Sequence, residues 1–121
     1  MMVGTNNRAV LEGHIAALHF LKQVGPDRVY QRIHDLARRV AERFAKLPNV
    51  EVLTPDDDRL YAGMVTVQFK GIGTKPLYEL ARKRRMWLPG SDRLRISTHI
   101  HTRPADLDAL FQTIHESLGL G

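Results

Sequence analysis

One amphipathic stretch between two helix-terminating signals most constrains what this chain can fold into. Its apolar residues recur every three or four positions and form a single stripe: Val29, Ile33, Leu36, Val40, Phe44 and Leu47. Gly25-Pro26 precedes the stretch and Pro48 follows it, and proline stops a helix because it lacks an amide hydrogen and clashes with the preceding turn. The pattern predicts a helix that begins at Pro26, stops at Pro48 and covers a core with one face.

Similar patterns predict three further helices and four strands. Helices are expected over about 7–23, from Thr74 as N-cap to about Arg85, and from Pro104 to Gly119. Strands are expected over 50–53, 64–69, 86–88 and 93–98. The last two flank Pro89-Gly90-Ser91-Asp92, whose residues favour a tight turn, so they are predicted to pair as a hairpin.

Strict alternation in two of these strands indicates a sheet that is covered on one face. Val65, Val67 and Phe69 share one side of the first, and in the other Leu94 and Ile96 face away from Arg95. The element order predicts an α+β fold, an α/β sandwich with a small antiparallel or mixed sheet and helices packed on one face. The other face would be free to meet another domain or subunit.

Length and composition fit one soluble domain. The chain has 121 residues, of which 43% are hydrophobic, and no apolar run approaches the roughly 18 residues of a membrane span. The N-terminus lacks the pattern of a secretory signal, and there is no cysteine, so a cytoplasmic location is expected.

A formal net charge of +5 raises the possibility of a polyanionic partner. The only dense basic run is Arg82-Lys83-Arg84-Arg85, and no aromatic residues are interleaved with it to stack on bases. Cations at a helix C-terminus also complement the helix dipole, so a solvated helix end accounts for the run and nucleic-acid binding is disfavoured.

Two segments carry groups that suit an anion, and each also has an ordinary structural interpretation. Gly4-Thr5-Asn6-Asn7 precedes a helix, where free amides, a hydroxyl and the helix dipole suit a phosphate, although the same residues make a common N-cap. Arg95 lies at the centre of a predicted strand, and its planar fork suits a carboxylate or phosphate as well as a surface ion pair.

Other kinds of site are poorly supported. His99 and His101 are expected on one side of a strand, but no third ligand is near enough in sequence to complete a metal site. There is no cysteine nucleophile and no Gly-x-Ser-x-Gly motif. No catalytic residue and no metal ligand is therefore assigned, and the chain is predicted to lack a self-contained active site.

Taken in order, several pieces of the chain resemble a known family. They are Gly4-Thr5-Asn6-Asn7, a following helix with Gly13, then Gly25, the helix over 32–47, and Leu94-Arg95-Ile96-Ser97-Thr98-His99. From Gly4 to Leu118 the chain looks like the C-terminal small domain of class V aminotransferases, which are fold-type I enzymes dependent on pyridoxal 5'-phosphate. The isopenicillin N epimerase-like and cysteine desulfurase-like branches are most similar in appearance.

The resemblance implies roles for individual residues. Gly4 and Thr5 match a pair whose threonine contacts the cofactor phosphate, commonly in the neighbouring subunit's site, which implies a homodimer. Arg95 matches the arginine that pairs with the α-carboxylate of an amino-acid substrate. His101-Thr102-Arg103 depart from the aromatic residue and Asn-Thr that often follow in the family, which leaves the substrate class open.

The resemblance also implies a partner. The lysine that holds the cofactor as a Schiff base is expected in a larger N-terminal domain, absent from this chain. None of the five lysines lies next to a histidine after a strand, as the cofactor lysine of the family does: Lys22, Lys46, Lys70, Lys75 and Lys83. The isolated chain is therefore expected to be inactive. The alternative is a non-catalytic interaction domain that binds a protein or a polyanion.

Overall fold

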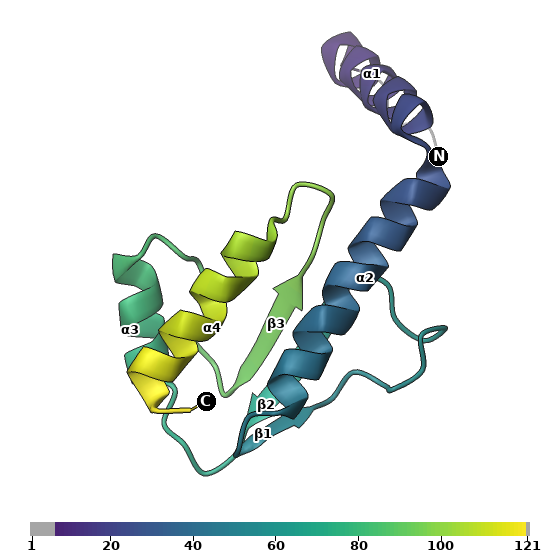
Figure 1. The fold of residues 1–121 in the computed structure, drawn as a ribbon. Coiled ribbons are helices and arrows are strands. Elements are labelled where there is room, and N and C mark those ends of the chain that lie inside the picture. Colours follow the sequence, from purple (N-terminus) through teal and green to yellow (C-terminus); the bar gives the residue numbers. More distant parts are fainter. Residues whose placement is uncertain (1–6, 121) are drawn as a thin grey trace, which may run out of the picture. The chain divides into compact units, whose positions relative to one another are not determined.

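The computed structural model describes residues 7–120, which form four helices and three strands (Figure 1). The elements are α1 (Arg8–Val24), α2 (Pro26–Ala45), β1 (Val50–Val52), β2 (Met64–Phe69), α3 (Lys75–Lys83), β3 (Arg93–Ser97) and α4 (Pro104–Leu118). They fall into two compact units, one that ends at Gln31 and one that begins at Arg32. No helix in the described part of the chain is long and apolar enough to cross a bilayer.

The first unit is dominated by α1, which begins and ends on clear local signals. The side chain of Asn7 accepts hydrogen bonds from the backbone N–H groups of Ala9 and Val10, and Gly25 ends the helix at a φ of 98°, a conformation that glycine adopts without strain. No residue of α1 is buried, and its large apolar side chains are 44–68% exposed: Val10, Leu11, Ile15, Leu18 and Phe20. An isolated helix of this length is marginal in water, so α1 is an element that needs a packing partner.

In the second unit, the sheet is antiparallel throughout, with the strand order β1-β2-β3. Val52 is paired with Val67 across β1 and β2, and Val67 is in turn paired with Leu94 across β2 and β3. The predicted α+β fold is confirmed, and the sheet is antiparallel rather than mixed.

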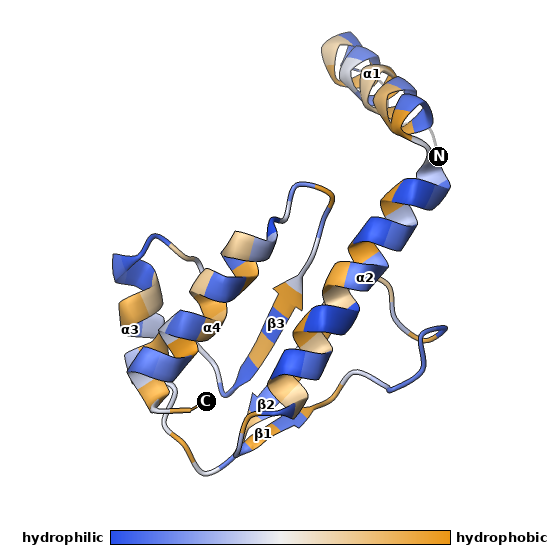
Figure 2. Ribbon diagram, in the orientation of Figure 1, coloured by the Kyte–Doolittle hydropathy of each residue, from blue (hydrophilic) through white to orange (hydrophobic). Residues whose placement is uncertain are grey.

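The core lies between one face of this sheet and the helices, as the alternation predicted. The sheet contributes Val65, Val67, Phe69 and Leu94. The helices contribute Leu36, Val40 and Phe44 from α2, Leu77 from α3, and Leu107, Leu110, Phe111 and Ile114 from α4. The rings of Phe44 and Phe111 lie 4.7 Å apart, centroid to centroid, where α2 meets α4. Figure 2 shows how hydrophobic and hydrophilic residues alternate along these elements.

The predicted hairpin between residues 86–88 and β3 is wrong. Residues 86–88 are not a strand, because they complete the end of α3: the Met86 N–H donates to the Ala81 carbonyl, and Arg85 turns the chain at a φ of 60°. The strand that pairs with β3 is β2, which precedes α3 in the chain. Trp87, predicted to lie in a strand, is 88% exposed.

Two element ends also differ slightly from the prediction. Helix α2 ends at Ala45 rather than at Pro48, and the N–H groups of Lys46 and Leu47 bond three residues back, which tightens the final turn. Helix α3 ends at Lys83, where the Arg84 N–H bonds to the carbonyls of Leu80 and Ala81. Helix α4 ends as predicted at Gly119, which has a φ of 67°.

Candidate functional site

Arg95 lies at the centre of β3 on the sheet face opposite the core. Its neighbours along the strand, Leu94 and Ile96, point to the covered side, whereas Arg95 is exposed and lies across from Thr66 of β2. Within residues 7–120 the guanidinium forms no hydrogen bond or ion pair. Arg95 therefore does not form a surface ion pair within residues 7–120, which is the ordinary interpretation of an arginine at such a position. The fork is available to an external carboxylate or phosphate.

The end of β3 is fixed by Thr98, which is only 5% exposed. Its hydroxyl donates to the carbonyl of Ile33 at 2.9 Å and lies 3.1 Å from the Gly63 carbonyl, and its backbone N–H donates to the same Gly63 carbonyl at 2.7 Å. These contacts tie β3 to α2 immediately after the residues that flank Arg95. The sequence contained no signal for this role, because both partners are distant in the chain.

His99 and His101 lie in a turn after β3 and not on an extended strand as expected. The Thr102 N–H donates to the His99 carbonyl at 3.0 Å, and the His99 N–H donates to the Thr102 hydroxyl at 2.9 Å. The centroids of the two imidazole rings are 5.1 Å apart. Among residues 7–120 there is no group of three or more His, Asp or Glu side chains that could hold a metal ion.

The phosphate-binding residues proposed from the resemblance, Gly4 and Thr5, lie outside the described residues. The structure begins at Asn7, whose side-chain oxygen already takes two of the free amides of α1. The first turn of α1 contains no acidic residue, so no carboxylate competes there with an anion. The role of Gly4 and Thr5 in binding a phosphate stays a prediction.

The basic run at the end of α3 is not uniformly solvated. Arg84 reaches α4, where it donates to the buried hydroxyl of Thr113 at 2.8 Å and pairs with the carboxylate of Glu116. Hydrogen bonds from Gln112 and Arg84 lower the pKa of Glu116 from its ordinary value. Arg84 therefore stabilises the contact between α3 and α4, and only its neighbours in the run remain free for a polyanion.

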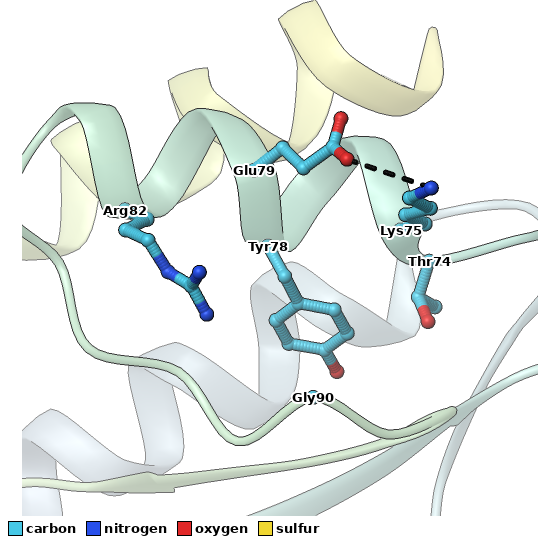
Figure 3. Close-up of a pocket in the computed structure, with 6 residues that line it drawn as sticks. All are labelled: Thr74, Lys75, Tyr78, Glu79, Arg82 and Gly90. Atoms are coloured by element: carbon cyan, nitrogen blue, oxygen red, sulfur yellow. Dashed lines mark ion pairs between the residues drawn. The ribbon is translucent and has the colours of Figure 1, made fainter.

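A hollow of about 380 Å³ lies beside α3 (Figure 3), and Arg95 is not among the residues that line it. Lys75 and Glu79 form an ion pair at its edge, with a nitrogen–oxygen distance of 3.8 Å. The Tyr78 ring points toward the loop that holds Gly90, and its hydroxyl donates to the Ser91 carbonyl. Arg82 also lines the hollow and its guanidinium forms no ion pair within residues 7–120, so the hollow offers one free cation. Arg95 remains the stronger candidate because its segment carries the resemblance to the family.

A family model described as "Aminotransferase class-V" matches residues 1–89. The chain belongs to the class V aminotransferase family. Arg95 lies beyond the matched residues, so its assigned role depends on the resemblance of its own segment.

Solved structures share the fold of this class V chain at low sequence identity. The cysteine desulfurase CsdA from Escherichia coli, in an S-sulfonic acid form, is 21% identical to this chain, with a TM-score of 0.79. The match covers 97% of this chain and 32% of the CsdA chain. The apo cysteine desulfurase from Thermococcus onnurineus NA1 is 16% identical with a TM-score of 0.82, over 98% of this chain and 33% of its own. A C-DES mutant with glycine covalently linked to its PLP cofactor is 20% identical, with a TM-score of 0.65, over 81% of this chain and 26% of the C-DES chain.

The class V chain thus spans about a third of the length of these structures. All five of its lysines are exposed, and two of them form ion pairs: Lys70 with Glu51, and Lys75 with Glu79.

Proposed function

We propose that this chain is the C-terminal small domain of a pyridoxal-phosphate enzyme that acts on an amino acid. The observation that carries the proposal is Arg95, an exposed guanidinium without a partner in the described chain, on the uncovered face of the sheet. Its role is to bind the α-carboxylate of the substrate as a bidentate pair. The family match supports the enzyme class over residues 1–89, and the role of Arg95 depends on the resemblance of its own segment.

The cofactor of the complete enzyme is pyridoxal 5'-phosphate, as the family and the PLP-linked neighbour indicate. When bound, it supplies an electron sink for the substrate's α-carbon. In our proposal Gly4 and Thr5 hold its phosphate from the segment before α1, in the site of a neighbouring subunit. The enzyme is accordingly proposed to be a cytoplasmic homodimer.

The lysine that bonds to the cofactor is proposed to come from a larger domain, since every lysine here is exposed on the surface. The apolar side of α1 is the surface proposed to pack on that domain, because Leu11, Ile15 and Leu18 are more than 40% exposed at helical spacing. The chain alone is expected to turn over no amino acid. Transamination, desulfuration and epimerisation all require that the substrate carboxylate is bound, so Arg95 does not distinguish among these reactions.

The test co-expresses this chain with the larger, cofactor-binding domain of a class V aminotransferase as a separate cofactor-binding polypeptide. A yellow complex should form, and its visible absorption should change when an amino acid is added. Arg95→Gln should raise the half-saturating amino-acid concentration by about 10- to 100-fold, the scale of a hydrogen bond to a charged group. Arg39→Gln, which removes another exposed cation, from α2, should leave that concentration unchanged.

Two results would count against the proposal. A complex that stays colourless contradicts the cofactor and partner assignments, and equal half-saturating concentrations for the two variants contradict the role of Arg95. Steeply salt-dependent nucleic-acid binding by the chain alone would instead favour the non-catalytic interaction domain.

A further inference from the structure

The uncovered face of the sheet presents a second arginine beside Arg95. Arg93 and Arg95 are two residues apart on β3, and both are exposed, whereas Leu94 between them is buried. Residues at this spacing on a strand lie about 7 Å apart along one face. Both guanidiniums can therefore reach a single small ligand.

The residues across from the two arginines on β2 are uncharged. Thr66 is paired with Arg95 and Gln68 with Arg93. Asp92, which precedes Arg93 in the chain, accepts from the Gln68 amide at 3.4 Å and from the Ser91 hydroxyl at 3.2 Å. Glu51, which is paired with Gln68 across β1 and β2, forms an ion pair with Lys70.

Arg93 accordingly forms no ion pair, and no side-chain hydrogen bond of its guanidinium is present in the described part of the chain. Two like charges on adjacent outward positions of one strand repel each other, and a ligand with two negative groups relieves that repulsion. Each planar fork also accepts one carboxylate in a bidentate pair. The arrangement is therefore complementary to a short carbon chain with a carboxylate at each end.

We infer that Arg93 is a specificity-determining residue that binds the side-chain carboxylate of an acidic amino-acid substrate while Arg95 binds its α-carboxylate. This inference rests on the proposed function for Arg95 and adds the substrate class. Monocarboxylic amino acids satisfy Arg95 alone, so they bind more weakly than dicarboxylic ones.

The experiment titrates the 121-residue chain with glutarate and, separately, with butyrate at fixed ionic strength, and follows the arginine Nε–Hε signals by NMR. Glutarate should shift the signals of Arg93 and Arg95 with one common dissociation constant, about threefold below that of butyrate, the scale of one exposed ion pair. Arg93→Gln should abolish this preference. Arg39→Gln is the matched control, because it lowers the net charge equally on α2 and should retain the preference.

The possible failures are distinguishable. If glutarate and butyrate both shift Arg95 with equal dissociation constants, or if Arg93→Gln retains the preference, the inference about Arg93 is overturned and the role of Arg95 stands. If neither compound shifts Arg95, its proposed carboxylate-binding function is itself contradicted. A shift of Arg39 as large as that of Arg93 would indicate general charge screening and would also overturn the inference.

Discussion

Gly63 lies where α2 and the end of β3 leave no room for a side chain. A Cβ atom at this position would be 2.4 Å from the Cγ2 of Ile33 and 3.0 Å from the Thr98 carbonyl oxygen. The Gly63 carbonyl also accepts from the Thr98 backbone N–H and lies 3.1 Å from the Thr98 hydroxyl oxygen. This one residue therefore sets how closely β3, and with it Arg95, approaches α2.

Gly63→Ala should lower the free energy of unfolding by about 1–3 kcal/mol, because the added methyl group forces the backbone of Thr98 or the side chain of Ile33 to move. Urea unfolding followed by circular dichroism measures the change. Gly73→Ala is the control, since an added Cβ there has no atom within 4 Å and the stability should stay close to that of the native chain. Equal stability of the two variants would contradict the tight contact.

Glu116 should make stability depend on pH. The pKa of Glu116 is lowered in the folded chain by Gln112 and Arg84, so its contribution to stability is present above its ordinary, unfolded-state pKa and is lost as the pH falls through the lower folded value. Glu116→Gln should therefore destabilise the chain at neutral pH and differ progressively less from it below about pH 4. Urea midpoints between neutral pH and pH 3 measure this, and a pH-independent difference would contradict it.

At the scale of elements, β3 pairs with β2 and not with residues 86–88, which are nearer to it in sequence. Residues 86–88 follow the α3 helix end, and the indole of Trp87 is almost fully exposed, whereas Leu94 of β3 is completely buried. Both segments have apolar residues, so composition alone did not separate them. The difference arises because β2 offers a ladder of five paired residues to β3.

Two substitutions test this assignment. Trp87→Ser should change the free energy of unfolding by no more than about 0.5 kcal/mol, because the side chain is 88% exposed. Leu94→Ala should cost about 2–5 kcal/mol, because it leaves a cavity in the core. Thermal or urea unfolding of the two variants measures the contrast, and a large loss from Trp87→Ser would indicate that residues 86–88 pack as a strand after all.

At the scale of the whole molecule, α1 and the sheet face are surfaces without a described partner. The chain spans about a third of the length of the cysteine desulfurases that share its fold, and α1 buries none of its residues. In the proposed enzyme, the larger domain covers α1, and the substrate lies against Arg95.

Ile15→Asp should leave the thermal unfolding of the second unit unchanged, because Ile15 is 44% exposed and lies in the first unit. It should abolish co-purification with the cofactor-binding polypeptide, since the charge would be buried in the contact. Gln23→Asp, at an exposed position near the end of the same helix, controls for the added charge and should still co-purify. Normal co-purification of the Ile15 variant would contradict the assigned surface.

The sequence by itself determined the helices, the two alternating strands and the outward direction of Arg95. These features depend on periodicities of 3.6 and 2 within short segments, which local sterics and burial enforce. It also carried the resemblance that led to the family. Neighbouring residues were enough for the helices, the strands and the direction of Arg95, whereas the resemblance depended on the order of several pieces between Gly4 and Leu118.

Only the tertiary structure decided which strand pairs with β3, that Arg84 binds Thr113 and Glu116 rather than solvent, and that Gly63 has no room for a side chain. It also placed uncharged partners opposite Arg93 and Arg95. Each of these facts depends on contacts between residues far apart in the chain. Such contacts arise from the joint packing of all the elements, and no local pattern encodes them.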